Sequence, residues 1–301
     1  MLIFHYSYYK NLKSIHMPVI SQLNIYPIKS MHGISTTKAE LTIRGLNYDR
    51  NWMIMDEDGL FLTQRNLPKL AAIRVDLSVD GLILHSPSGD VFSVPFNGSR
   101  NKEISVEVWG DLCKAYDEGD EISAWLTKNL GKFKGKSLRL VRFKKEFKRE
   151  VDADYLKGEK SHTAFADGFP FLVTSENSLN RLNERLIENG SESVPMDRFR
   201  PNIVLTGMDA FLENRLEELF SADGRYRLGI RKPCKRCKVT TVDQDFGTIA
   251  EPKEPLRTLT EMNTVPGLHG AYFGQNATLL SGKNNTIKVG DQVRFTLKSE
   301  E

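Results

Sequence analysis

The sequence predicts a β-rich α/β protein made of two modules. Short segments in which apolar and polar residues alternate recur in both halves of the 301-residue chain, with turn residues between them. Amphipathic helix patterns are few, and the two clear ones cover residues 120–130 and 175–189. The length allows one large domain or two ordinary ones, because a domain typically holds roughly 100–200 residues. We expect two domains, at residues 17–140 and 141–298.

The first module is predicted to be a sheet or barrel of short strands. Asp56–Gly59 is typical of a turn, and Asp80-Gly81 favours a two-residue hairpin turn. The helix of residues 120–130 ends where Gly131 interrupts its apolar face. The predicted strands are Val19–Ile25, Leu41–Ile43, Trp52–Met55, Leu60–Leu62, Leu77–Val79, Leu82–Leu84, Val91–Val94 and Ile104–Val108.

The second module is also predicted to be β-rich. Residues 144–154 are rich in charge and poor in apolar anchors, so we expect a domain junction or a mobile loop there. The helix that follows has Ser175 as its N-cap and Gly190 at the left-handed position after its end. Its apolar stripe consists of Leu179, Leu182, Leu186 and Ile187. The predicted strands are Asn202–Thr206, Tyr226–Ile230, Val239–Val242, Ala277–Leu280, Thr286–Val289 and Gln292–Phe295.

Composition excludes several classes of protein. With 42 lysines and arginines against 39 acidic residues, the net charge of +3 is too weak for a dedicated nucleic-acid binder. Three cysteines are an odd number, which argues against a disulfide scaffold and for a reducing compartment. No apolar run is long enough for a secretory signal or a membrane span, so we expect a cytoplasmic protein. We expect residues 1–16 to be a poorly ordered extension or the product of an upstream start codon, with Met17 as the alternative start.

The most informative segment runs from Arg231 to Val242 and contains Cys234 and Cys237. Motifs for dinucleotides, the P-loop, metalloprotease zinc and the serine nucleophile elbow are all missing from the chain. Five cationic residues crowd around the two cysteines. They are Arg231, Lys232, Lys235, Arg236 and Lys238.

Four interpretations of this segment compete. A zinc site needs four ligands, and the third cysteine, Cys113, is distant in sequence. A thioredoxin-like pair has this spacing but opens a helix, whereas a strand is predicted here. In the third interpretation, Cys234 and Cys237 are inert residues of the core, since free cysteines are commonly buried. We favour the fourth interpretation, a thiolate that ligates a soft metal on a phosphorylated cofactor, because cationic neighbours lower a thiol's pKa and bind phosphate.

Short motifs along the chain, in their order and spacing, resemble the MOSC family of molybdenum-cofactor-binding proteins. The similarity covers about residues 19–297 and is greatest to the two-part MOSC proteins that reduce amidoximes and to their bacterial relatives. Its markers are Tyr26–Ser30, Asp49–Trp52, Phe199–Asn202, Pro233–Asp243, Glu254–Leu256, Phe273–Gln275 and Ile287–Asp291. The resemblance implies a MOSC-type β-barrel with flanking helices, preceded by an N-terminal β-barrel-like domain, with the cofactor between them.

The resemblance also implies roles for individual residues. Cys237 matches the family's catalytic, molybdenum-ligating cysteine, and we expect the strand at residues 239–242 to hold it rigidly. Lysine and arginine would bind the phosphate of the molybdenum cofactor (Mo-molybdopterin), while serine and asparagine would contact the pterin. The expected cofactor-binding residues are Lys29, Ser30, Arg50, Arg200, Asn202, Lys235 and Arg236.

The implied function is the two-electron reduction of N-hydroxylated compounds, from N–OH to N–H. Because flavin, nicotinamide and iron–sulfur motifs are missing, we expect electrons from a separate donor protein of ferredoxin, flavoprotein or cytochrome type. Two alternatives stay open. One is a non-catalytic carrier of molybdenum cofactor, or of sulfur on Cys237, and the other is a thiol oxidoreductase that uses Cys234 and Cys237.

Some residues near the expected pocket depart from the family's pattern. Gly168-Phe169 follows Asp167 where relatives carry Thr-Ser, Lys235 stands where serine is common, and Asn276 replaces a tyrosine. Because these residues differ near the pocket, the resemblance does not identify the substrate. Asp209, just past the strand at residues 202–206, is either a turn-stabilising residue or a proton donor near the substrate.

Overall fold

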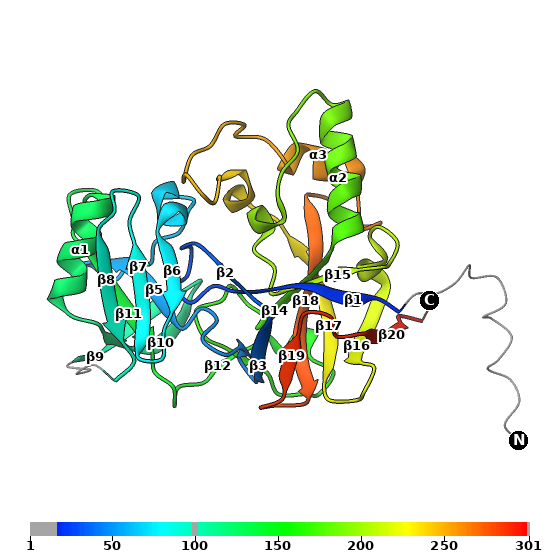
Figure 1. Cartoon of the computed structure of the whole chain (residues 1–301), viewed down its shortest axis with the longest axis horizontal. Helices are drawn as coiled ribbons and strands as arrows, with labels where there is room; N and C mark the ends of the chain where they lie inside the picture. Colours follow the sequence, from blue (N-terminus) through cyan, green and yellow to red (C-terminus); the bar gives the residue numbers. More distant parts are fainter. Residues whose placement is uncertain (1–16, 98–101, 300–301) are drawn as a thin grey trace, which may run out of the picture.

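A computed structural model describes residues 17–97 and 102–299 (Figure 1). The expected extension at residues 1–16 lies outside the described residues. The fold is β-rich, as predicted, and its α-helices within the described ranges are α1 (Asp120–Leu130), α2 (Glu176–Glu188) and α3 (Leu256–Met262). Across these ranges, no helix has both the length and the apolar character that a membrane span requires.

An eight-stranded sheet forms the larger lobe of the molecule, on the right in Figure 1. Its strands lie in the order β2-β1-β15-β14-β18-β17-β16-β20, and neighbours are antiparallel except for β14 and β15. The strands are β1 (Val19–Ile25), β2 (Ile34–Thr36), β14 (Phe171–Ser175), β15 (Ile203–Thr206), β16 (Leu216–Ser221), β17 (Arg227–Lys235), β18 (Tyr272–Ser281) and β20 (Val293–Leu297).

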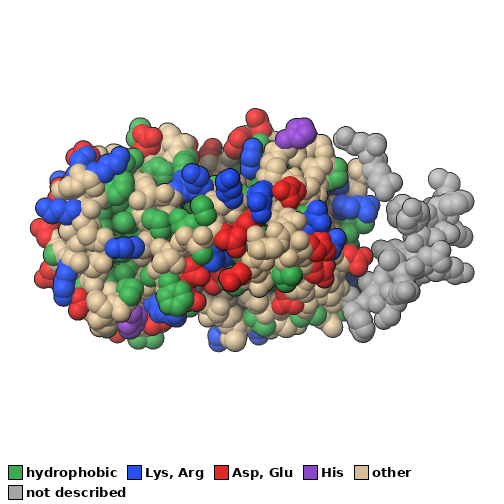
Figure 2. Space-filling view, turned by 90° about the horizontal axis from the view of Figure 1, so that it is seen from above, with side chains coloured by type: hydrophobic (Ala, Val, Ile, Leu, Met, Phe, Trp, Pro, Cys, Tyr) green, Lys and Arg blue, Asp and Glu red, His purple; other side chains and the backbone are tan. Residues whose placement is uncertain are grey.

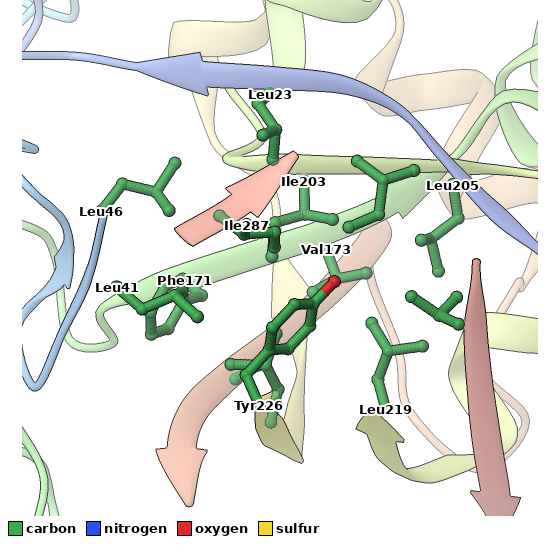
Figure 3. Close-up of a cluster of buried hydrophobic side chains, with 14 of the residues drawn as sticks. Leu23, Leu41, Leu46, Phe171, Val173, Ile203, Leu205, Leu219, Tyr226 and Ile287 are labelled. Carbon is green, nitrogen blue, oxygen red and sulfur yellow. The ribbon is translucent and has the colours of Figure 1, made fainter. Parts of the chain in front are cut away.

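Backbone hydrogen bonds join β1 to the start of β20, although the two strands are far apart in the strand order of the sheet. Val19 in β1 forms an isolated bridge with Gln292, and the Val293 N–H donates to the Pro18 carbonyl over 2.9 Å. Strand β20 therefore returns to β1, and the sheet curls around an apolar core like a barrel. Figure 3 shows side chains that fill this core, among them Leu23, Val173, Ile203, Leu205, Leu219 and Tyr226.

The smaller lobe contains two sheets and helix α1 around a second core. One sheet has the order β5-β11-β10-β9 and the other β6-β7-β8. Their strands are β5 (Trp52–Asp56), β6 (Arg74–Leu77), β7 (Gly81–His85), β8 (Val91–Pro95), β9 (Lys102–Val108), β10 (Asp111–Asp117) and β11 (Leu138–Phe143). Helix α1 has the predicted bounds, and buries Trp125 and Leu126 against these sheets because its apolar residues share one face.

Helices α2 and α3 lie over the larger lobe, at the top of Figure 1. The Ser175 hydroxyl caps α2 by accepting from the Ser178 N–H over 3.2 Å, as the sequence predicted. Leu182 and Leu186 are fully buried. The prediction was wrong for Ile187, which is 64% exposed because it lies about 100° around the helix from Leu186.

Two predicted strands do not form, and a third, predicted at Leu77–Val79, lies instead at Arg74–Leu77. Residues 239–242 were expected in a strand, but Lys238–Thr241 form a 3₁₀ turn, η5. The hydroxyls of Thr240 and Thr241 donate to carbonyls three residues earlier, which stabilises a turn over an extended chain. Leu60–Leu62 contributes only one bridge, from Phe61 to Met55.

The charge-rich stretch at residues 144–154 contains a short strand, β12 (Arg149–Glu150), which pairs with β13 (His162–Thr163). Two more small pairings involve β3 (Lys38–Thr42), β4 (Gly45–Leu46) and β19 (Thr286–Lys288). Strand β11 spans residue 140, where we placed the domain boundary, and β1 lies in the sheet of the larger lobe. Because these two sheets each cross the predicted boundary, the domains at residues 17–140 and 141–298 stay a prediction.

Candidate functional site

One pocket lies where the two lobes meet, and all eight residues predicted to contact a cofactor or metal line it. Figure 2, seen from above, shows lysine and arginine side chains gathered over the middle of the molecule. The predicted residues fall on two walls. The N-terminal wall consists of Lys29, Ser30 and Arg50, and the C-terminal wall consists of Arg200, Asn202, Lys235, Arg236 and Cys237.

Cys237 is a free, half-buried thiol at the turn between β17 and η5. Its carbonyl accepts from the N–H and the hydroxyl of Thr240, both over 3.0 Å. These two bonds fix the backbone of Cys237, which is the role we had assigned to a strand. The thiol is therefore held at the start of a hydrogen-bonded 3₁₀ turn on the pocket wall, where it can bind a metal.

Cys234 lies in β17 and contacts Arg236. The Arg236 guanidinium donates from Nη1 to Cys234 Sγ over 2.8 Å and from Nη2 to the Phe199 carbonyl over 2.8 Å. Its Nε is buried and has no partner among the described residues. One N–H of Arg236 is therefore still available to an anion in the pocket.

Lys29 is 5% exposed and pairs with Asp167 across the pocket. Its ammonium also donates to the Phe165 carbonyl over 2.9 Å. Burial lowers the pKa of Lys29, and the charge of Asp167 opposes that shift. The Asp167 side chain is exposed, and the Lys29 charge together with the hydrogen bonds from Lys29 and Trp109 lowers its pKa. Asp167 therefore stays ionised at neutral pH.

Arg50 is tied to buried acceptors. Its Nη1 donates to both oxygens of Asp49, over 2.8 and 2.7 Å, and Asp49 is 2% exposed. Its Nη2 donates to the Arg200 carbonyl over 3.1 Å, which joins the two walls. Arg50 and Arg200 each lie 4.3 Å from the centre of the Tyr26 ring. Arg50 is thus both a pocket residue and a structural cation.

A buried polar network lies behind Arg200. The side chains of Gln64 and Gln244 exchange two hydrogen bonds, over 2.9 and 3.0 Å, and Gln64 also donates to the Ser30 carbonyl. Arg200 donates from Nη1 to Gln244 over 2.9 Å, while its buried Nη2 has no partner among the described residues. Burial lowers the pKa of Arg200 to about 10, so it remains charged at neutral pH.

Asn202 lines the pocket, but its side chain is occupied by protein. Its Oδ1 accepts from Arg50 Nη1 over 3.2 Å and from the Leu172 N–H over 3.1 Å, and its Nδ2 donates to the Asn24 carbonyl. Asn202 therefore positions Arg50 and the strands around it, so a direct contact with the pterin would need these bonds to change.

Backbone strain concentrates in this pocket. Ser30, Arg50, Trp109 and Arg200 line it with φ values of 68°, 47°, 57° and 54°. Residues with a Cβ rarely adopt this left-handed conformation, and it persists where surrounding contacts impose it, commonly at functional sites.

Sequence reasoning missed several residues of this pocket, gave no role to its apolar residues Ala166, Phe171 and Leu172, and assigned none to Asp167. The missed polar and aromatic side chains of the N-terminal half are Thr63, Arg65 and Trp109. A sequence signal for Trp109 exists, because it precedes a glycine between two alternating strands and so occupies a hairpin tip. The departures Gly168, Lys235 and Asn276 also line the pocket.

Two further sequence expectations concern residues outside the pocket. Asp209 is exposed and absent from the pocket lining, and its carbonyl accepts from the Leu212 N–H at the start of a 3₁₀ turn. Cys113 is buried in the smaller lobe, away from the pocket lining, and burial raises the pKa of its thiol to about 11. Within the described ranges, His, Cys, Asp and Glu form no group of three or more able to hold a metal.

Two family models match the chain. The MOSC N-terminal beta barrel domain matches residues 17–133, and the MOSC domain matches residues 160–294. The chain therefore belongs to the MOSC family and has its two-part organisation.

Within that family, the chain is similar to amidoxime reducing components. Mitochondrial amidoxime reducing component 2 of Bos taurus is 38% identical over 291 residues, which cover 91% of this chain and 82% of that protein. Mitochondrial amidoxime-reducing component 1 of Homo sapiens is 33% identical over 287 residues, with the same coverage of 91% and 82%. Molybdenum cofactor sulfurase of Bos taurus is 29% identical over 93% of this chain but only 32% of that protein.

Proposed function

We propose that this protein is a molybdenum-cofactor-dependent oxidoreductase that reduces N-hydroxylated compounds. The observation that carries the proposal is the convergence of a free thiol, Cys237, with cations from both walls in one pocket. The names of the relatives, amidoxime reducing component and molybdenum cofactor sulfurase, support the cofactor and the substrate class.

The residues present fit such a cofactor. Cys237 would supply a thiolate ligand to the metal, and the cofactor itself would supply the remaining sulfur ligands. Arg200 Nη2 and Arg236 Nε are buried N–H donors without partners among the residues that the structure describes, which is the condition expected of groups that bind an anion. Exposed Lys235 would add a third positive charge at the phosphate.

The chain's own residues bind and orient the reactants. When bound, the molybdenum centre supplies the two-electron chemistry that converts N–OH to N–H. Asp167, ionised beside Lys29, accepts hydrogen bonds from a substrate N–H or O–H but does not donate a proton at neutral pH. Partly buried Arg50 and buried Asn202 hold the two walls in register around the pocket. We propose a separate ferredoxin, flavoprotein or cytochrome as the electron donor.

The test is to purify the full chain from a molybdenum-replete host and to measure molybdenum content and dye-driven reduction of benzamidoxime together. Stoichiometric molybdenum with turnover supports the enzyme. Cofactor without turnover supports the carrier, which the similarity to molybdenum cofactor sulfurase makes the second candidate. Protein without molybdenum, whose Cys234–Cys237 dithiol cycles between oxidised and reduced forms, overturns the proposal in favour of a thiol oxidoreductase.

A further inference from the structure

Trp109 occupies a position that a tryptophan rarely takes. It forms a two-residue turn with Gly110 between β9 and β10, where Val108 pairs directly with Asp111. Both turn residues have positive φ, 57° at Trp109 and 91° at Gly110. Asparagine, aspartate or glycine fills the first position of such a turn with less strain. A bulky residue held there points to a role outside the turn.

The indole is held from several sides. Its Nε1 donates to Asp167 Oδ1 over 3.0 Å, and Phe61 packs edge-on with ring centres 4.9 Å apart. The Arg65 guanidinium lies 4.2 Å from the centre of the Trp109 ring. These contacts come from separate segments of the chain, so the orientation of the ring is fixed before any ligand binds.

The fixed ring is nevertheless uncovered. Trp109 is 44% exposed and lines the same pocket as Cys237. The other two tryptophans, Trp52 and Trp125, are 2% and 9% exposed and belong to the core of the smaller lobe. Trp109 therefore presents a rigid apolar surface inside a pocket that also holds charged side chains.

We infer that Trp109 is a specificity-determining residue, an aromatic wall that selects N-hydroxylated substrates with a planar aryl group over small aliphatic ones. The inference rests on the proposed function and names its substrate class. An aryl ring that packs on an indole gains affinity beyond simple burial, worth about twofold to tenfold. Lys29 Nζ lies 5.8 Å from the ring and Arg65 is closer, so the wall suits neutral aryl compounds rather than cations.

The first test compares benzamidoxime with acetamidoxime in dye-driven reduction by the cofactor-loaded full chain. Asparagine suits this turn, so Trp109→Asn should keep the hairpin. In this variant, kcat/KM for benzamidoxime divided by kcat/KM for acetamidoxime should fall about twofold to tenfold. Trp109→Phe should retain most of the wild-type ratio. Leu112→Asn, in the same hairpin at 71% exposure and outside the pocket lining, should leave the ratio unchanged. An equal loss for both substrates in Trp109→Asn, or no loss for either, overturns the inference.

The second test does not require turnover. Because Trp109 is the exposed tryptophan of the three, benzamidoxime should change the intrinsic fluorescence of the full chain saturably, and acetamidoxime should not. The change should vanish in Trp109→Asn, while Trp52 and Trp125 still report the fold. If the tryptophan emission of the wild-type protein stays unchanged at a high concentration of benzamidoxime, the inference that the aryl group packs against Trp109 is wrong. If the wild-type protein reduces neither compound, the proposed reductase fails, and the titration still decides the role of Trp109.

Discussion

The two walls of the pocket carry similar residues but use them differently. On the N-terminal wall, Lys29 and Ser30 are 5% and 8% exposed, and Arg50 is tied to buried Asp49. On the C-terminal wall, Lys235 is exposed and Cys237 is a free thiol. The first wall therefore commits its charges to protein partners, while the second, apart from Asn202, keeps donors or a thiol available. Cations in one pocket can thus differ in whether their loss affects stability or binding.

The sharpest test of this difference is Arg50→Met. It leaves the Asp49 carboxylate buried without its cation, so we expect a loss of about 3–5 kcal/mol in the free energy of unfolding. Denaturant unfolding measures this value, and Asp49→Asn combined with Arg50→Met should recover part of it. If Arg50→Met is as stable as the wild type, the N-terminal wall is not structural.

Glu213, a buried acid outside the pocket lining, is a second buried charge whose loss should affect stability. Burial raises the pKa of Glu213 to about 7, although the Ser178 hydroxyl donates to it over 2.8 Å, and its Oε1 has no partner among the described residues. The neutral acid is favoured in the folded state, so its contribution to stability is complete below the unfolded pKa of about 4.5 and is lost as the pH rises through about 7.

Glu213→Gln keeps the acceptor for Ser178 and removes the charge. We expect the variant to be more stable than the wild type by about 1–3 kcal/mol at pH 8, with the advantage disappearing below pH of about 4.5. Thermal unfolding across this range measures the effect. Equal pH profiles for the two proteins would show that Glu213 ionises without a penalty.

The smallest effect is expected on the C-terminal wall. Lys235→Met should leave the free energy of unfolding within about 0.5 kcal/mol of the wild type, because the side chain is exposed. It should weaken retention of the molybdenum cofactor about twofold to fivefold through the loss of one phosphate contact. The matched control is Lys238→Met, which is also exposed but does not line the pocket. If both variants lose cofactor equally, the effect comes from the lower positive charge of the protein and not from a contact of Lys235 with the phosphate.

Sequence patterns predicted the frame of the molecule well where local physics decides it. Strand β1 and helix α1 have the predicted bounds, because alternation and a glycine stop are local signals. The run Val239–Val242 misled the prediction, since its β-branched residues favour a strand until the threonine hydroxyls bond backward to carbonyls.

Motif order grouped residues that line one pocket, while their roles stay a prediction and their hydrogen bonds were not foreseen. Motifs brought Lys29, Arg50 and Cys237 into one list, and they do line one pocket. The pattern could not show that Asn202 is fully bonded to protein, because its partners come from residues 24, 50 and 172. Left-handed backbone at Arg50 and Arg200 also has no sequence signal, since neither residue prefers it.

The central claim is that Cys237, and not Cys234, holds the metal at which substrate is reduced. The most direct measurement is dye-driven turnover of benzamidoxime per bound molybdenum in Cys237→Ala and Cys234→Ala, with thermal unfolding of both. We predict that Cys237→Ala loses more than about 100-fold in turnover with an intact fold, because the loss of a direct ligand should exceed that of a supporting residue. Cys234→Ala should keep most of its turnover. Full turnover in Cys237→Ala would contradict the account.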